Sequence, residues 1–253
     1  MNAKIADIEF CIPGRALTNE ALAVEHPEWD MDSVTKRTGV ETRYLAEAGE
    51  TALDLAEKAC LKLFERHERD EVDAVLFCTQ TPDHVMPPNA CILHGRLGLR
   101  EDAIAFDFAL ACSGFVYGLG IAQGYVRSRL ARRILLINAD TYSRLINPGD
   151  RSTRTLFSDA ASATLVDAGK ESEGFLAASF ATDGSKHGSF IVPAGGQRQP
   201  LSPDTQKVTI DKSGNALSPE NIQMKGMDIL VFVNTKVPKQ INALMLDSGL
   251  SVG

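Results

Sequence analysis

Short apolar segments alternate with amphipathic ones along the first two thirds of the chain. Residues 3–10 alternate apolar and polar positions, as a half-buried strand does. Later segments are short and mostly apolar, which is typical of buried strands, namely 72–79, 104–108, 134–138 and 162–166. Apolar residues recur at helical spacing between them, over 51–63, 89–97 and 113–130. This order predicts a layered α/β architecture with a largely parallel sheet.

Local signals mark where several of these elements begin. Thr51 is followed three residues later by Asp54, which predicts a capping box, and Asn89 is the expected cap of the next helix. The stretch 25–50 is expected to begin as a loop.

The pattern changes after residue 168. We expect paired strands over 175–181 and 189–192, then a polar excursion over 194–220 that either shapes a substrate entrance or is a surface insertion. A helix is predicted from about Met224 to Val237, with Pro238 either kinking it or starting another helix over 239–248. The predicted domains are therefore 1–168 and 169–253.

Composition and charge narrow the class of protein. The 253 residues are 44% hydrophobic and 23% charged, as in globular proteins, which excludes a disordered or fibrous chain. The net charge of −7 and the aromatic content of 6% argue against a nucleic-acid partner. The N-terminus lacks a signal-peptide pattern and no apolar run is long enough to span a membrane, so we expect no membrane partner. Five cysteines without CxxC spacing predict neither a disulfide framework nor a metal site, and the expected location is the cytoplasm.

Cys112 is the strongest candidate for chemistry. It follows a predicted buried strand and precedes a predicted helix, where unpaired N–H groups favour a thiolate and stabilise an oxyanion. The alternative is that Cys112 is a small buried apolar residue, and burial is the favoured interpretation for the other four cysteines. Arg37 and Arg151 lie in expected loops, where each either holds a phosphate or is an ordinary surface arginine.

Several stretches together resemble the β-ketoacyl-acyl carrier protein synthase III family of the thiolase superfamily. The segment FDFALACSGFVYGLGIA (106–122) is similar to the family's active-site segment. The family's other characteristic stretches also occur along this chain in the family's order, at 36–43, 49–56, 81–87, 150–163 and 224–226.

The resemblance implies a thiolase-like αβαβα fold and a role for each matching residue. Cys112 would accept an acyl group and condense it with a malonyl thioester, releasing carbon dioxide. The substrates would be coenzyme A and acyl carrier protein thioesters, with no further cofactor and no metal, and the protein would be a homodimer. The positions implied to bind the substrate are Arg37 and Arg151 for the nucleotide, Leu156, Phe157, Met224 and Gly226 for pantetheine, and Met86 for the partner subunit's acyl pocket.

The sequence departs from the family at its C-terminal end. The family's catalytic histidine and asparagine lie in segments beyond the last residues of this chain, and no residue here matches them. We therefore expect an incomplete second half and less than full activity, either because the chain is a fragment or because the gene is shortened. Two alternatives stay open: acyl transfer without decarboxylation, and a catalytically silent partner subunit.

Overall fold

The computed structural model describes residues 1–249 of the chain. They divide into two compact units, each assembled from stretches that are distant in the sequence. The first, here the sheet unit, comprises 1–15, 44–141 and 159–178. The second, here the helical unit, comprises 16–43, 142–158 and 179–249. The predicted division at residue 168 concerns two thiolase-like halves and stays a prediction.

The sheet unit is built on five strands in the order β1-β7-β6-β4-β5. Their bounds are β1 (Asn2–Cys11), β4 (Ala74–Cys78), β5 (Ile104–Phe108), β6 (Arg133–Asp140) and β7 (Ala160–Gly169). β4 runs parallel to both β5 and β6, whereas β7 is antiparallel to β6 and to β1. The predicted strands are therefore confirmed, but the sheet is mixed rather than largely parallel. The reason is that β7 returns after a connection without a crossover helix packed on the sheet.

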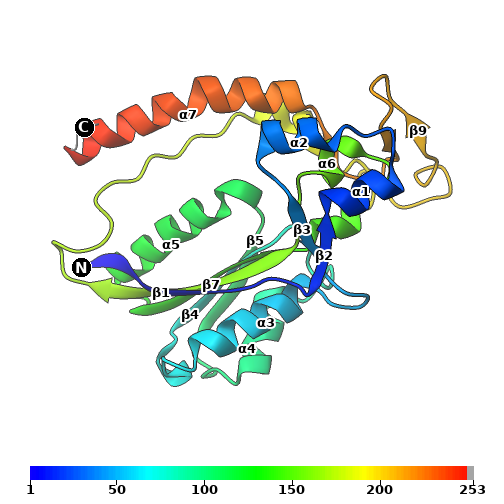
Figure 1. Ribbon diagram of the computed structural model, residues 1–253. Helices are drawn as coiled ribbons and strands as arrows, with labels where there is room; N and C mark the ends of the chain where they lie inside the picture. Colours follow the sequence, from blue (N-terminus) through cyan, green and yellow to red (C-terminus); the bar gives the residue numbers. More distant parts are fainter. Residues whose placement is uncertain (250–253) are drawn as a thin grey trace. The chain divides into compact units, whose positions relative to one another are not determined.

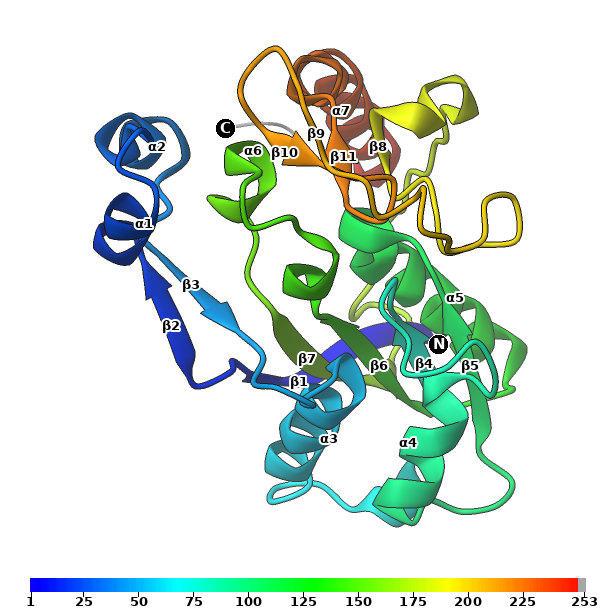
Figure 2. The ribbon, with the colours of Figure 1, turned by 90° about the vertical axis from the view of Figure 1, so that its right-hand side faces the viewer.

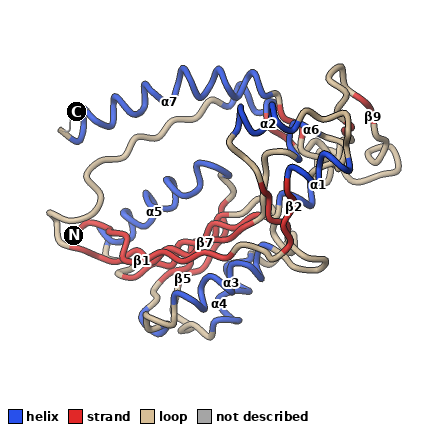
Figure 3. Tube along the Cα trace, in the orientation of Figure 1, coloured by secondary structure: helices blue, strands red, loops and turns tan. Residues whose placement is uncertain are grey.

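Helices cover both faces of this sheet (Figures 1 and 3). α3 (Ala52–Leu63) and α4 (Asn89–Leu97) lie on one face and α5 (Gly114–Ser128) lies on the other. In β4, Val75 and Phe77 belong to the core beneath α3 and α4, whereas Ala74 and Leu76 belong to the core beneath α5. A strand covered on both faces must be apolar at successive positions, which is why 72–79 has no alternating pattern.

A local capping box stabilises the start of α3, whereas a contact with a distant residue stabilises the start of α4. Thr51 and Asp54 form the predicted capping box of α3. The prediction for Asn89 is wrong, because Asn89 is the first residue of α4 and its cap, Pro88, has no capping side chain. The backbone N–H groups of Asn89 and Ala90 instead donate to the carboxylate of Asp107 at the end of β5.

The described part of the helical unit contains short helices, one long helix and short two-stranded ladders. Its helices are α1 (Asn19–Glu25), α2 (Met31–Thr38), α6 (Arg151–Arg154) and α7 (Gly226–Ser248). β2 (Arg15–Thr18) pairs with β3 (Thr42–Leu45), and the two lie side by side in Figure 2. The loop expected at the start of 25–50 is confined to 26–30, since Asp30 caps α2 and Gly39 ends this helix with a φ of 71°. α2 has only eight residues and is mostly polar, so its apolar positions are too few to reveal a helical pattern in the sequence.

The C-terminal part of the helical unit also differs from the prediction. The expected strand over 175–181 is absent from the described structure of that stretch. β8 (Phe190–Ile191) pairs instead with β11 (Gln223–Met224), and β9 (Thr209–Ile210) pairs with β10 (Ala216–Leu217). α7 continues through Pro238 as a single helix. No helix of the described residues is long and apolar enough to cross a membrane.

Candidate active site

The nucleophile candidate lies on a tight elbow between a strand and a helix. β5 ends at Phe108, a single 3-10 turn spans Ala111–Ser113, and α5 begins at Gly114. Cys112 is the central residue of that turn and its side chain is exposed. Ala111 has a φ of 45°, a left-handed conformation that costs an alanine of order 1 kcal/mol or more. The elbow therefore holds the thiol outward at the beginning of α5, where N–H groups lack helical partners.

The other cysteines differ from Cys112 in exposure or in setting. Cys11, Cys60 and Cys78 are buried, as predicted, and burial raises the pKa of the Cys60 and Cys78 thiols. A raised pKa keeps these two thiols protonated and unreactive. Cys91 is exposed, contrary to the prediction, and its Sγ lies 3.9 Å from the carbonyl oxygen of Ala105.

The floor beneath the elbow explains why residue 114 is a glycine. A Cβ added to Gly114 would lie 2.1 Å from Sγ of Cys78 and 3.3 Å from the side-chain nitrogen of Asn138. The side-chain oxygen of Asn138 is buried and has no hydrogen-bond partner among residues 1–249. Cys78 and Asn138 occupy paired positions on β4 and β6. The close packing of the first residue of α5 against these two strand ends thus fixes the distance between the elbow that carries Cys112 and the sheet.

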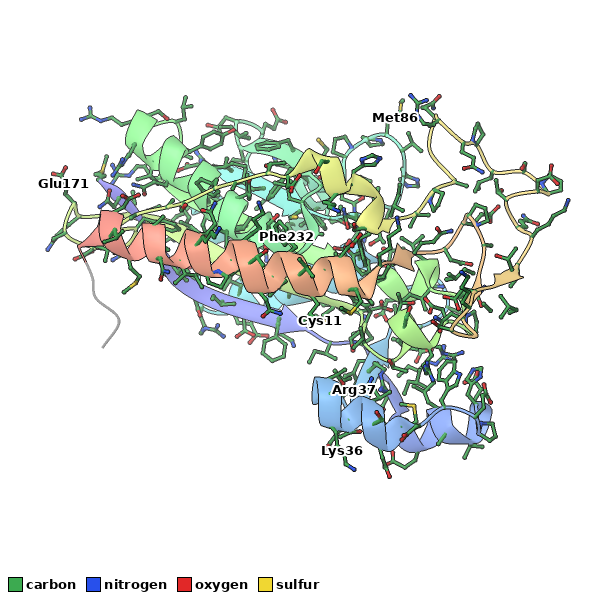
Figure 4. All side chains as sticks on the ribbon, turned by 90° about the horizontal axis from the view of Figure 1, so that it is seen from above. Cys11, Lys36, Arg37, Met86, Glu171 and Phe232 are labelled. Atoms are coloured by element: carbon green, nitrogen blue, oxygen red, sulfur yellow. The ribbon has the colours of Figure 1, made fainter. Side chains whose placement is uncertain are left out.

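The two arginines expected to bind a nucleotide are both exposed residues of the helical unit. Arg37 lies in the last turn of α2, next to Lys36 (Figure 4). Arg151 is the first residue of α6, whose N-cap Asp150 accepts a hydrogen bond from the backbone N–H of Ser152. Both therefore lie on helices rather than in loops, with their guanidinium groups available to a phosphate.

Two of the residues expected to contact pantetheine, Phe157 and Met224, lie beside Phe190. Phe190 is paired with Met224 across β8 and β11, and its ring centre lies 5.9 Å from that of Phe157. Phe157 also makes an edge contact with Tyr142 at 5.5 Å. Leu156 and Phe157 follow α6 directly, and Gly226 is the exposed first residue of α7. Their roles in binding stay predictions.

A buried arginine, Arg43, links α2, which carries Arg37, to the segment that follows α6, which carries Arg151. Arg43 is fully buried and donates from Nε to the carbonyl oxygen of Thr155 at 3.0 Å and from Nη1 to that of Leu17 at 3.3 Å. Its Nη2 donates to the side-chain oxygen of Asn19, whose own amide nitrogen donates to Thr35 of α2. In the sequence, Arg43 stands out only as the last residue of a family motif. Its burial is visible only in the structure.

The polar excursion over 194–220 contacts the turn that precedes α6. The backbone N–H of Ala216 donates to the carbonyl oxygen of Gly149 at 3.0 Å. Just after the excursion, the side-chain oxygen of Asn221 accepts from the side-chain nitrogen of Asn147 at 3.1 Å. Burial opposes the shift, but hydrogen bonds from Asn215 and Ser213 lower the pKa of Asp211, and the positive charge of Arg151 contributes in the same direction. The excursion therefore packs beside Arg151.

Comparisons with known proteins agree with this arrangement. A family model described as 3-oxoacyl-[acyl-carrier-protein (ACP)] synthase III matches residues 106–184. A β-ketoacyl-[acyl-carrier-protein] synthase III of Sulfurovum sp. (strain NBC37-1) is 33% identical over 99% of this chain and 72% of its own length. The corresponding protein of Caldanaerobacter subterraneus subsp. tengcongensis is 34% identical over 87% of this chain and 64% of its own length.

The solved structures extend the comparison to the fold. The crystal structure of a 3-oxoacyl-(acyl-carrier-protein) synthase III matches 99% of this chain and 75% of its own, with a TM-score of 0.94 and 41% identity. This match confirms the predicted thiolase-like layered α/β fold. The chain thus spans 64% to 75% of the length of these relatives.

Proposed function

The chain belongs to the β-ketoacyl-acyl carrier protein synthase III family, and on that premise we propose that Cys112 carries an acyl group for a decarboxylative condensation. In the first step the Cys112 thiolate attacks the carbonyl carbon of an acyl thioester. A new carbon–sulfur bond forms at Cys112, the bond to the donor sulfur breaks, and the donor leaves as a thiolate that takes up the proton released when the Cys112 thiol ionised. N–H groups at the start of α5 are suited to stabilise the oxyanion formed on the way.

In the second step a malonyl thioester loses carbon dioxide, and the carbanion left behind attacks the acyl carbonyl carbon. The bond to Cys112 breaks and the thiol is restored. Covalent catalysis of this kind divides one difficult reaction into two easier ones. The class is that of an acyltransferase acting in lipid synthesis.

The observation that carries this proposal is the placement of Cys112. Of the described cysteines, only Cys91 shares its exposure, and Cys91 lies within a regular helix rather than on a strained elbow. Arg37 and Arg151 are the proposed contacts to the nucleotide of coenzyme A, because a guanidinium binds phosphate bidentately. Leu156, Phe157, Met224 and Gly226 are the proposed contacts to pantetheine.

The proposal includes partners and a location. We propose acyl carrier protein as the malonyl donor and a second copy of the chain as the subunit that receives Met86, whose side chain is 78% exposed. The proposed location is the cytoplasm, and neither a metal nor a prosthetic group takes part.

The test of acylation is the intact mass of the chain after incubation with acetyl-coenzyme A. We expect an added acetyl group on the unsubstituted chain and on Cys91→Ala, but not on Cys112→Ala. Cys91→Ala is the matched control, because it removes the other exposed thiol. A stable adduct on Cys112→Ala would refute the assignment.

The test of condensation is carbon dioxide release from labelled malonyl-acyl carrier protein by the acetylated chain. Release above that of Cys112→Ala is the expected result. Transfer of the acetyl group without any release would exclude a decarboxylative reaction.

A further inference from the structure

The backbone of Leu110 is held at both of its polar groups. Its carbonyl oxygen accepts hydrogen bonds from the backbone N–H of Ser113 at 3.1 Å and from the hydroxyl of the same serine at 2.8 Å. Its N–H group donates a hydrogen bond to the sulfur of Cys78, which is buried. Leu110 directly precedes Ala111, so these bonds act where the chain passes from β5 into the elbow.

The sulfur of Cys78 is itself fixed by its surroundings. Cys78 is the last residue of β4 and is only 2% exposed. A hydrogen bond from the side chain of Asn138, its partner on β6, reaches the same sulfur. Burial raises the pKa of the Cys78 thiol more than the bonds from Leu110 and Asn138 lower it, so the group stays a neutral thiol whose lone pairs can accept both bonds. The elbow is therefore held by an acceptor that has little freedom to move.

Ala111 needs such support, because its backbone conformation is unfavourable. Its φ of 45° lies in the left-handed region, where the Cβ of an L-residue crowds the following carbonyl oxygen. Strained residues persist only where the surrounding structure holds them in several ways at once. The bonds from Ser113 close the turn that contains Ala111, and the bond to Cys78 fixes the residue before it. Without these bonds the turn can relax, and Cys112, the next residue, moves with it.

We propose that Cys78 and Ser113 are positioning residues that keep the elbow in its strained conformation and thereby align the sulfur of Cys112 for acyl transfer. The proposal deepens the proposed function and rests on it. Acylation passes through an oxyanion, which must form within reach of the N–H groups at the start of α5. Alkylation of the same sulfur by iodoacetamide forms no oxyanion and needs only an accessible thiolate. A displaced elbow therefore slows acylation more than alkylation, whereas general loss of stability leaves the ratio of the two rates unchanged.

Conservative substitutions separate the hydrogen bonds from packing alone. Ser113→Ala removes the hydroxyl donor and Ser113→Thr keeps one; because Ser113 is exposed, both variants are expected to fold. Cys78→Ala removes the sulfur, whereas Cys78→Ser keeps a small acceptor in its place. The control for the serine is Ser128→Ala, because that exposed hydroxyl also donates to a carbonyl oxygen of α5, that of Gly124 at 2.8 Å. The control for the cysteine is Cys60→Ala, because Cys60 is equally buried but lies on α3.

The experiment measures how fast acetyl-coenzyme A acylates Cys112 and how fast iodoacetamide alkylates it, both from the mass of the peptide that carries this residue. We expect Ser113→Ala and Cys78→Ala each to lower the ratio of the acylation rate to the alkylation rate by about tenfold. Ser113→Thr and Cys78→Ser should restore most of the ratio, and both controls should keep it. An unchanged ratio in Ser113→Ala and Cys78→Ala would overturn the proposal.

The strain at position 111 allows a sharper test. Glycine adopts a positive φ about as readily as a negative one, so Ala111→Gly removes the conformational penalty that the positioning residues offset. Ser113→Ala should therefore lower the ratio by about twofold or less in the Ala111→Gly background, against about tenfold in the unsubstituted one. An equal loss in both backgrounds would overturn the proposal that the serine holds a strained elbow.

Hydrogen exchange separates the support of the elbow from its effect on the reaction. Cys78→Ala is expected to speed exchange of the Leu110 amide, whereas Cys60→Ala is not. Unchanged exchange at Leu110 in Cys78→Ala would overturn the support by the sulfur. If acetyl-coenzyme A does not acylate the unsubstituted chain, the proposed function fails and the alignment claim falls with it, while the exchange data still decide whether the sulfur holds the elbow.

Discussion

The close contact beneath the elbow predicts a large effect for one added methyl group. Gly114 has a φ of −56° and a ψ of −41°, so alanine can adopt its backbone conformation without strain. The new Cβ would, however, lie 2.1 Å from Sγ of Cys78, whereas heavy atoms in contact are normally separated by about 3.5 Å or more. Cys78 is only 2% exposed, so its sulfur has little room to move away.

The magnitude follows from two opposing contributions. Forcing an extra methyl group into a packed core costs about 1–3 kcal/mol. Replacing glycine by alanine in a helix recovers about 0.5–1 kcal/mol. Gly114→Ala should therefore lower the free energy of unfolding by about 1–2 kcal/mol. Gly124→Ala is the control on the same helix: nothing lies within 4 Å of its added Cβ, so it should raise that free energy by about 0.5–1 kcal/mol.

The assay is urea unfolding of both variants, of Cys78→Ala and of the double variant Cys78→Ala/Gly114→Ala. Removing the sulfur makes room for the methyl group, so the cycle should show a favourable coupling of about 1 kcal/mol or more. Gly114→Ala should also change the rate at which iodoacetamide alkylates Cys112, because the elbow must shift. Equal stability of Gly114→Ala and Gly124→Ala, or zero coupling with Cys78, would refute the packing argument.

Three further predictions concern other parts of the chain. Arg43→Met should lower the free energy of unfolding by about 3 kcal/mol or more, because it leaves buried acceptors unpaired. The control Arg37→Met, at an exposed position, should change that free energy by less than about 0.5 kcal/mol. Equal losses of stability for the two variants in urea unfolding would contradict this prediction. Burial raises the pKa of Asp140, so the folded state holds that proton more tightly than the unfolded state. Stability should therefore fall as pH rises from about 4 through the raised pKa, and Asp140→Asn should lose that part of the slope; identical pH profiles of thermal unfolding would refute it. Thr51→Ala removes half of the capping box with Asp54 and should cost about 1 kcal/mol by urea unfolding; no loss would show that the cap contributes nothing.

Local sequence determined the elements whose signals are short-range. The four apolar strand segments and the capping box at Thr51 are each visible in a few consecutive residues. The change from a strand to a helix at Cys112 is likewise visible in a few consecutive residues. The motifs along the chain, in their order, indicated the family. These features need no distant partner, so one sequence suffices to find them.

Distant contacts decided what the sequence left open. α2 is polar and short, and Thr35 of that helix bonds to Asn19, the partner of Arg43. Residues 189–192 have strand-like composition, but their partner is Gln223–Met224, more than thirty residues away, rather than the nearer segment 175–181. A β-ladder needs two segments that pair with each other, and which segments pair is decided only in the folded chain.

The surroundings of the candidate nucleophile divide in the same way. The chemistry of Cys112 follows from its residue type and its place before a helix. That Asp107 caps α4, that Asp140 holds the root of the Met86 loop, and that Cys78 excludes a side chain at position 114 depend on β4, β5 and β6 ending side by side. Sequence spacing cannot give that register, because hydrogen bonds between strands are made by backbone groups that every residue carries.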